Sequence, residues 1–118
     1  MIKMASIKNQ TRKFTIIDNA KLCRSMFCKA FGFMFRFKKP DHALVFIFNK
    51  EVRADLHMFL VFFSIDVLFL DKDKNVVDIK KDFNPFNYYA PKAKAMYVVE
   101  LPVEMLGKTA VGDKIIFN

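Results

Sequence analysis

The segment Ala43–Phe48 reads ALVFIF, six apolar residues with no polar residue among them. A half-exposed strand would alternate apolar and polar residues, whereas a continuous short run is typical of a strand that is buried on both faces. The sequence therefore predicts a central strand here, and the rest of the chain must supply an apolar layer on each side of it.

The segments around this strand predict an α+β fold. An apolar stripe over Ala20–Phe31, followed by Gly32, predicts one main N-terminal helix. The 118 residues predict a single domain, residues 1–118, with 1–10 as a flexible tail or an edge strand. The expected architecture is a small curled β-sheet or barrel of six to eight strands packed by that helix. The other strand patterns are at Arg12–Asp18, Leu56–Leu70 (two strands with a kink near Phe63), Val76–Ile79, Ala95–Leu101 and Val111–Phe117.

The two cysteines lie in the sequence CRSMFC, at Cys23 and Cys28. Their spacing matches neither a C-x-x-C motif nor a zinc-binding pattern. On the predicted helix, five residues turn the chain so that the two thiols face different ways. Both cysteines are therefore expected to be reduced.

The basic charge is concentrated at the start of the chain. The net charge is +8, and the first forty residues hold ten Lys or Arg side chains against one acidic side chain, Asp18. A local surplus of this kind can bind a polyanion by neutralising phosphates, or it can simply be a solvated face that maintains solubility. The residues assigned to the nucleic-acid alternative are Lys21, Arg24, Lys29, Lys38 and Lys39.

No targeting or membrane-spanning segment is evident. The segment Met1–Gln10 lacks the apolar core of a signal peptide. The run Leu56–Leu70 is shorter than the ~20 residues that a membrane-spanning helix needs, and it contains His57 and Asp66. The protein is therefore expected to be cytoplasmic, with no membrane span.

One carboxylate, Asp66, interrupts the apolar run that ends at Leu70. In a strand, Ser64, Asp66 and Leu68 share one face, and neither face is clearly a solvent face. A buried carboxylate must find a cation, collect backbone N–H donors or stay protonated. Arg36 is the preferred cation because its guanidinium can hold a carboxylate through two hydrogen bonds. The pair is expected either to fix the helix exit to the sheet or to bind a polar ligand at the mouth of a pocket.

Seven short motifs occur in an order that resembles the domain-of-unknown-function family 192, an uncharacterised family of bacteria and archaea. The resemblance covers the chain from about Phe14 onward. It implies a compact, strand-rich fold with one helix near the start, and no established activity. The motifs are GFMFR at Gly32–Arg36, ALVFIF at Ala43–Phe48, HM at His57–Met58, IDVLFLD at Ile65–Asp71, VVDI at Val76–Ile79, YVVELP at Tyr97–Pro102 and VGDKI at Val111–Ile115.

The chain departs from the family pattern at three places. The family usually has Trp at the position of His57, a polar run where 59–61 is apolar, and Gly at the position of Glu104. The resemblance therefore applies to individual residues. It carries over to Gly32, Met34, Arg36, Met58 and Asp66.

The loop 83–91 is the best candidate for recognition, because its aromatic side chains stand beside the amides of Asn84 and Asn87. Such residues can stack on a sugar or a base and hydrogen-bond to it; alternatively, the aromatic rings close the open end of the barrel. The predicted function is a binding module for a small polar ligand, which could be a saccharide. The predicted ligand-binding residues are Arg36, Met58, Asp66, Phe86, Tyr88 and Tyr89.

Enzymatic chemistry finds little support in the motifs. No G-x-S-x-G motif is present, and neither cysteine has a recognisable histidine partner. The three glycines cannot form a phosphate-binding glycine-rich loop, and the two histidines stand apart from any cluster of metal ligands. No catalytic residue, cofactor or metal is therefore assigned. The enzyme alternative would use Asp66 as a general base.

Overall fold

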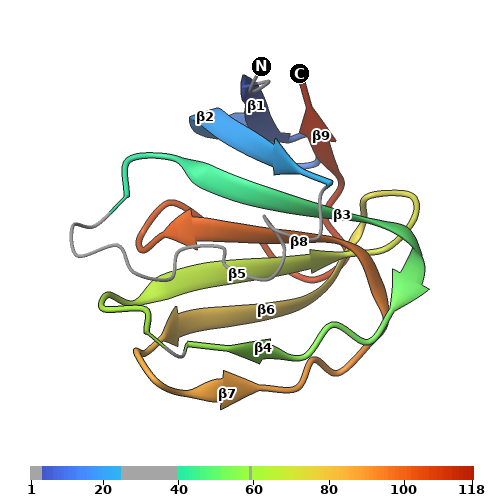
Figure 1. The fold of residues 1–118 in the computed structure, drawn as a ribbon. Coiled ribbons are helices and arrows are strands. Elements are labelled where there is room, and N and C mark those ends of the chain that lie inside the picture. The colour runs from blue at the N-terminus through green and yellow to red at the C-terminus, as the bar shows by residue number, and fades with distance from the viewer. Residues whose placement is uncertain (1–3, 25–39, 59) are drawn as a thin grey trace.

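The computed structural model describes residues 4–24, 40–58 and 60–118, and these residues form nine strands (Figure 1). The strands are β1 (Met4–Asn9), β2 (Phe14–Cys23), β3 (Ala43–Val52), β4 (Leu56–His57), β5 (Ile65–Leu70), β6 (Val76–Phe83), β7 (Tyr88–Tyr89), β8 (Ala95–Pro102) and β9 (Ile115–Phe117).

Seven of the strands form one sheet in the order β6-β5-β8-β3-β2-β1-β9, and β4 pairs with β7 in a separate two-stranded ribbon. The pairs are antiparallel except for β2 and β3, which run parallel over Ala20–Cys23 and Ala43–Phe46. A parallel pair requires a crossover connection. The strand β1 lies between β2 and β9 and is paired on both sides over Ile7–Asn9.

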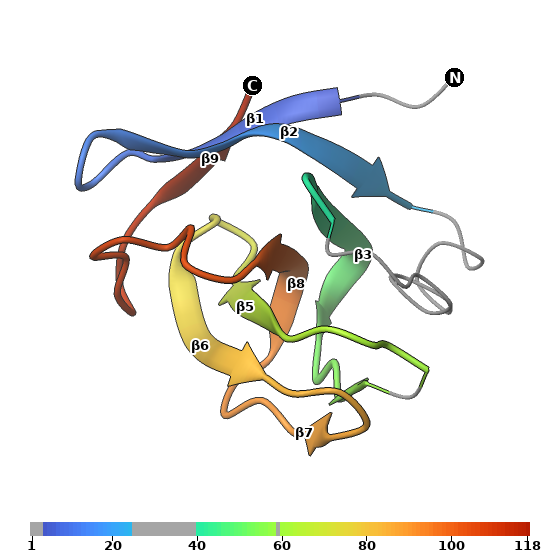
Figure 2. The same cartoon turned by 90° about the vertical axis from the view of Figure 1, so that its left-hand side faces the viewer.

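The large sheet curls until its two outer strands approach each other (Figure 2). The amide of Val76 donates to the carbonyl of Asp113 at 2.9 Å, and the amide of Gly112 donates to the carbonyl of Val76 at 2.8 Å. An isolated bridge between Asn75 and Lys114 adds to this contact. The start of β6 is therefore fastened to the segment that leads into β9, and the sheet forms a partly closed barrel.

Two apolar clusters lie on opposite faces of the sheet. The side chains of Ala43, Val45 and Ile47 belong to the cluster inside the curl, which we call the inner core. Those of Leu44 and Phe46 belong to a second cluster, the outer core, to which the β4–β7 ribbon contributes partly buried side chains. The prediction that Ala43–Phe48 is a central strand covered on both faces is confirmed.

The α+β fold class is wrong. The described residues contain strands and turns and no helix, and their strand count exceeds the six to eight expected. The curled sheet itself was expected. Most of the predicted helix, together with its stop at Gly32, lies outside the described residues.

The start of the predicted helix is a strand for a tertiary reason. Ala20 and Cys23 are buried because β2 continues to Cys23 and pairs with β3. The predicted helix placed Leu22 and Cys23 on one apolar face, whereas in the strand they pack on opposite faces of the sheet. Tertiary pairing overrides a local pattern of this length. Cys23 is disulfide-bonded, so the expectation of a reduced thiol there is also wrong; Cys28 lies outside the described residues.

The run Leu56–Leu70 divides as the sequence predicts. It gives β4 and β5 with a bend at Phe63 between them, and β5 forms an antiparallel pair with β6 across the turn 71–75. The side chain of Asp71 caps this turn by accepting the amides of Asp73 and Asn75, each at 2.9 Å. Within the described residues, no helix is long and apolar enough to cross a membrane.

Candidate functional site

The carboxylate of Asp66 is buried, with 4% of the residue exposed, and both of its oxygens accept backbone hydrogen bonds. Oδ1 accepts the amide of Asp82 at 2.9 Å, and Oδ2 accepts the amide of Glu104 at 3.1 Å. Asp66 therefore joins the end of β6 to the turn that follows β8. A buried carboxylate needs hydrogen-bond donors or a cation, and here two backbone amides supply the donors.

Both amide donors belong to residues with a left-handed backbone. The φ angle is 48° at Asp82 and 71° at Glu104, in the region that glycine adopts without strain. A glycine, which the family resemblance implies at the position of Glu104, would adopt this conformation without strain. A cavity of about 310 Å³ lies beside these turns and is lined by Asp66, Lys81, Asp82, Glu104, Leu106 and Gly107.

The geometry favours the structural role for Asp66. The proposed partner Arg36 lies outside the described residues. Within the described residues, the hydrogen bonds to the Asp66 carboxylate come from backbone amides, and neither a histidine nor a second carboxyl side chain donates to it. Asp82 and Glu104 also line the cavity beside Asp66, although their side chains are not among the hydrogen-bond partners of its carboxylate in the described residues.

The side chain of Met58 is buried in the outer core, so its hydrogen bonds to the neighbouring loop are made by its backbone. Its carbonyl accepts the amide of Phe86 at 2.8 Å and that of Val61 at 3.2 Å, and its own amide donates to the carbonyl of Asn87 at 2.7 Å. Phe86 is held in a left-handed conformation, with φ at 64°, and 58% of the residue is exposed. Its ring contacts that of Phe62 edge to face, with 5.8 Å between the ring centroids.

The two tyrosines of the loop have different environments. Tyr88 is exposed, and its hydroxyl donates to Asp55, which raises the pKa of the tyrosine. Tyr89 packs its ring beside those of Phe69 and Phe83 in the outer core, and its hydroxyl donates to the buried carboxylate of Asp78 at 2.6 Å. Burial, followed by this hydrogen bond, raises the pKa of Tyr89 to about 12. One aromatic side chain thus completes a core while its neighbour faces solvent.

The described members of the predicted site do not converge on one point. The side chains of Ile65 and Val67 belong to the outer core, so the alternation of β5 directs Asp66 toward the opposite face. Met58 and Tyr89, by contrast, lie with the outer core. Asp66 and the aromatic loop are therefore separate features.

Tyr89 borders a groove, a cavity of about 580 Å³ between β6 and the turn 109–111. The ammonium group of Lys80 lies 5.6 Å from the centroid of the Tyr89 ring. The backbone amide of Lys92 donates to Asp78 at 2.9 Å, so the same buried carboxylate positions Tyr89 and Lys92. The groove is lined by Ile79, Lys80, Lys81, Tyr89, Lys92, Thr109, Ala110 and Val111. Sequence reasoning found Tyr89 and missed the three lysines.

A second acidic group in an apolar strand, Glu100, was not recognised from the sequence. In the sheet it stands directly between Leu44 of β3 and Val67 of β5, and both of these side chains belong to the outer core. Burial raises the pKa of Glu100 to about 7. The glutamate in YVVEL was the available signal, because it breaks an apolar strand as Asp66 does.

Replacing Glu100 with glutamine is expected to stabilise the protein at alkaline pH. The pKa in the folded state, about 7, lies above the ordinary value of 4.5, so the folded state binds the proton more tightly. Stability should then fall as the pH rises from the ordinary pKa to the folded one. Glu100→Gln removes this loss, worth about 1–2 kcal/mol near pH 8 for a half-buried group. Urea unfolding at acidic and alkaline pH measures it, and an equal effect at both would contradict the assignment.

The residues of the nucleic-acid alternative are only partly described. Lys21 is half-buried on β2, and Arg24 is exposed just beyond the end of that strand. Lys29, Lys38 and Lys39 lie outside the described residues. The basic side chains that can be placed near Lys21 are those of the β1–β2 hairpin.

The fold and its grooves define a small, curled β domain with cavities of ligand size on its surface. The chain belongs to the domain-of-unknown-function family DUF192, described as "Uncharacterized ACR", whose family model matches residues 6–117. It is 40% identical over 116 residues to a UPF0127 protein of Pyrococcus abyssi, covering 95% of this chain and 97% of that protein. A UPF0127 protein of Pyrococcus horikoshii is 39% identical over 113 residues, covering 92% and 96%. The family predicted from the sequence motifs is confirmed.

Two solved structures share the fold. A protein of unknown function from Novosphingobium aromaticivorans has a TM-score of 0.82 at 19% identity, covering 98% of this chain and 84% of its own. A Sinorhizobium meliloti protein, described as a proposed transcription regulator, has a TM-score of 0.83 at 20% identity, covering 99% and 94%. At these identities the likeness concerns the fold alone.

Proposed function

We propose that this chain is a binding module for a small, negatively charged polar ligand, and that the ligand occupies the groove beside Tyr89. The observation that carries the proposal is the composition of this groove, in which three lysines and a tyrosine line a cavity of about 580 Å³. That volume lies in the range of ordinary small-molecule sites. The groove is larger than the cavity beside Asp66, whose volume is about 310 Å³.

The chemistry of the groove favours an anion with a polar body. Lys80, Lys81 and Lys92 offer ammonium groups, which bind phosphate or carboxylate as point charges. The hydroxyl of Thr109 adds a further hydrogen-bonding group. Because Asp78 fixes both Tyr89 and the backbone of Lys92, this side of the groove is held in place before a ligand arrives.

The proposal is tested by titrating the protein with ribose 5-phosphate, with ribose as the uncharged control, and following amide chemical shifts. Ribose 5-phosphate is expected to shift the amides of residues 79–81, Tyr89, Lys92 and 109–111, because these line the groove. Removing two of the three ammonium groups in Lys80→Gln/Lys92→Gln should weaken this binding by about tenfold, since each charge-assisted contact contributes roughly 0.7 kcal/mol at a solvated site.

The matched control is Lys50→Gln/Lys72→Gln, which removes the same charge from two exposed positions on β3 and the β5–β6 turn. It should bind ribose 5-phosphate as the unmodified protein does. Equal weakening in both double variants would show that net charge, and not this groove, is responsible. Shifts of the same size with ribose would contradict the requirement for an anion.

A further inference from the structure

The outer face of the β2–β1–β9 part of the sheet is basic. Side chains alternate between the two faces along a strand. Ile7 of β1 and Ile115 of β9 point into the inner core, so their neighbours Lys8 and Ile116 point outward. The pairing places Lys8 beside Thr15 on one side and Ile116 on the other. It also places Lys21 opposite Met4, which is exposed. Lys8 and Lys21 therefore stand on the same outward face of the hairpin.

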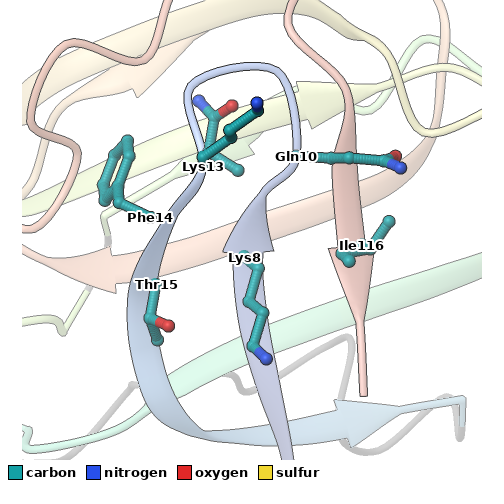
Figure 3. Close-up of a pocket in the computed structure, with 7 residues that line it drawn as sticks. Lys8, Gln10, Lys13, Phe14, Thr15 and Ile116 are labelled. Carbon is teal, nitrogen blue, oxygen red and sulfur yellow. The ribbon is translucent and has the colours of Figure 1, made fainter.

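A hollow of about 350 Å³ lies on this face, close to the hairpin turn (Figure 3). Figure 3 shows Lys8 and Thr15 on adjacent strands and Lys13 at the bend, with Gln10 and Ile116 on the other side. The residues that line the hollow carry two ammonium groups, an amide and a hydroxyl, each of which can donate a hydrogen bond to an anionic oxygen. In Figure 3 the side chain of Lys8 extends away from the bend, and that of Lys13 lies at the bend. The lining residues are Lys8, Asn9, Gln10, Lys13, Phe14, Thr15 and Ile116.

The positive charge of this face is not neutralised by the residues that the structure describes. The ion pairs among them are Arg12 with Asp113 and His42 with Asp41, so Lys8, Lys13 and Lys21 take no part in one. The only acidic residue in the stretch 4–24 is Asp18. This contrasts with the other cationic side chain of the hairpin, Arg12, which Asp113 holds at 2.6 Å.

The backbone presents Lys13 in an uncommon conformation. Its φ angle is 59°, in the left-handed region that disfavours side chains other than those of Asn, Asp and Gly. Left-handed residues of this kind gather at binding sites, where the surrounding structure holds them. Here the hairpin carries a lysine at a position where a glycine would be less strained.

We propose that this face binds the phosphate backbone of a nucleic acid, with Lys8 and Lys13, at either end of the hollow (Figure 3), contacting separate phosphates. The charge continues beyond the hollow, because Lys21 lies at the other end of β1, roughly 13 Å from Lys8 by the rise of a strand. That length covers several phosphates of a nucleic-acid strand, whereas a small anion would fill the hollow alone. The contacts are to phosphate, so binding is independent of base sequence. This site is separate from the groove of Tyr89.

Fluorescence anisotropy of a labelled single-stranded DNA tests the proposal at increasing salt concentration. The unmodified protein should bind at low salt, with an affinity that falls as salt rises. Lys8→Gln/Lys13→Gln should weaken binding about tenfold at low salt and reduce the slope of log affinity against log salt by about 1.4, since each phosphate contact on single strands contributes about 0.7. A DNA of scrambled sequence should bind equally well.

The control is Lys50→Gln/Lys94→Gln, which removes the same charge from exposed positions outside the hairpin and should leave the slope unchanged. Amide shifts of the unmodified protein give a second readout, and these should gather at residues 8–15 and 21. The proposal is overturned if DNA does not bind at low salt, or if the control pair weakens binding equally. It is also overturned if inorganic phosphate shifts the same amides while DNA does not.

Discussion

Asp66→Ala is expected to lower the free energy of unfolding by about 3 kcal/mol, because it leaves two backbone amides without their acceptor. The carboxylate is buried and receives the amides of Asp82 and Glu104, both in left-handed conformations. Without it, these turns lose the contact that offsets their backbone strain. Urea unfolding measures the loss directly, and the thermal midpoint should fall by roughly 10 °C.

Asp73→Ala is the matched control, because Asp73 is an exposed aspartate in the turn after β5. Its backbone amide and carbonyl form hydrogen bonds, which an alanine retains. The change in stability should stay within about 0.5 kcal/mol. Equal melting temperatures for the two variants would contradict the assignment of Asp66 as a buried hydrogen-bond acceptor.

Asp113→Ala should have an effect of similar size, again about 3 kcal/mol. Oδ2 of this buried carboxylate accepts the side chain of Arg12 at 2.6 Å, and the Asn9 side-chain amide and the backbone amide of Ala110 at 3.0 Å each. The substitution removes one of the acceptors of the fully buried Asn9 side-chain amide, which keeps its hydrogen bond to the hydroxyl of Thr109. Chemical unfolding near neutral pH gives the measurement.

The loss of stability as the pH falls provides a sharper test of the role of Asp113. Burial raises the pKa of this carboxyl, but the hydrogen bonds from Asn9, Arg12 and Ala110 outweigh burial and hold the pKa below the ordinary 3.8. The folded state thus binds the proton less tightly, so this stabilisation is present above 3.8 and is lost as the pH falls through the lower folded value. The alanine variant should show a shallower acid loss. Asp41→Ala, at an exposed residue, should retain the original slope, and identical slopes in all three proteins would refute the assignment.

The sequence predicted the central strand better than it predicted which segments pair with it. Ala43–Phe48 could be assigned to a central strand because its lack of a polar face leaves one physical solution. Residues 20–23 could not, because their apolar spacing suits a helix face as well as a strand that pairs with β3. Only the tertiary pairing decides between these, and it joins segments about twenty residues apart.

The candidate site was partly predictable for a related reason. A charge in an apolar strand identifies Asp66, and the same argument would have identified Glu100. The partners of Asp66 could not be foreseen, because they are backbone amides at left-handed residues that are not glycines. The groove beside Tyr89 required the turn 109–111 to meet β6, and the contact between Val76 and Asp113 that brings them together leaves no local signal in the sequence.

The pairing of β1 with β9 has a consequence for the order of folding. Ser6 and Asn118 exchange backbone hydrogen bonds of 2.8 and 2.9 Å, and the side chains of Asn9 and Asp113 bond across 104 positions of the chain. On a ribosome, β1 and β2 emerge early, but the second edge of β1 has no partner until β9 has been synthesised. Contacts of such long sequence separation slow folding, and an unpaired edge invites association with other chains. From the synthesis of β1 until that of β9, the nascent chain therefore carries an open strand edge.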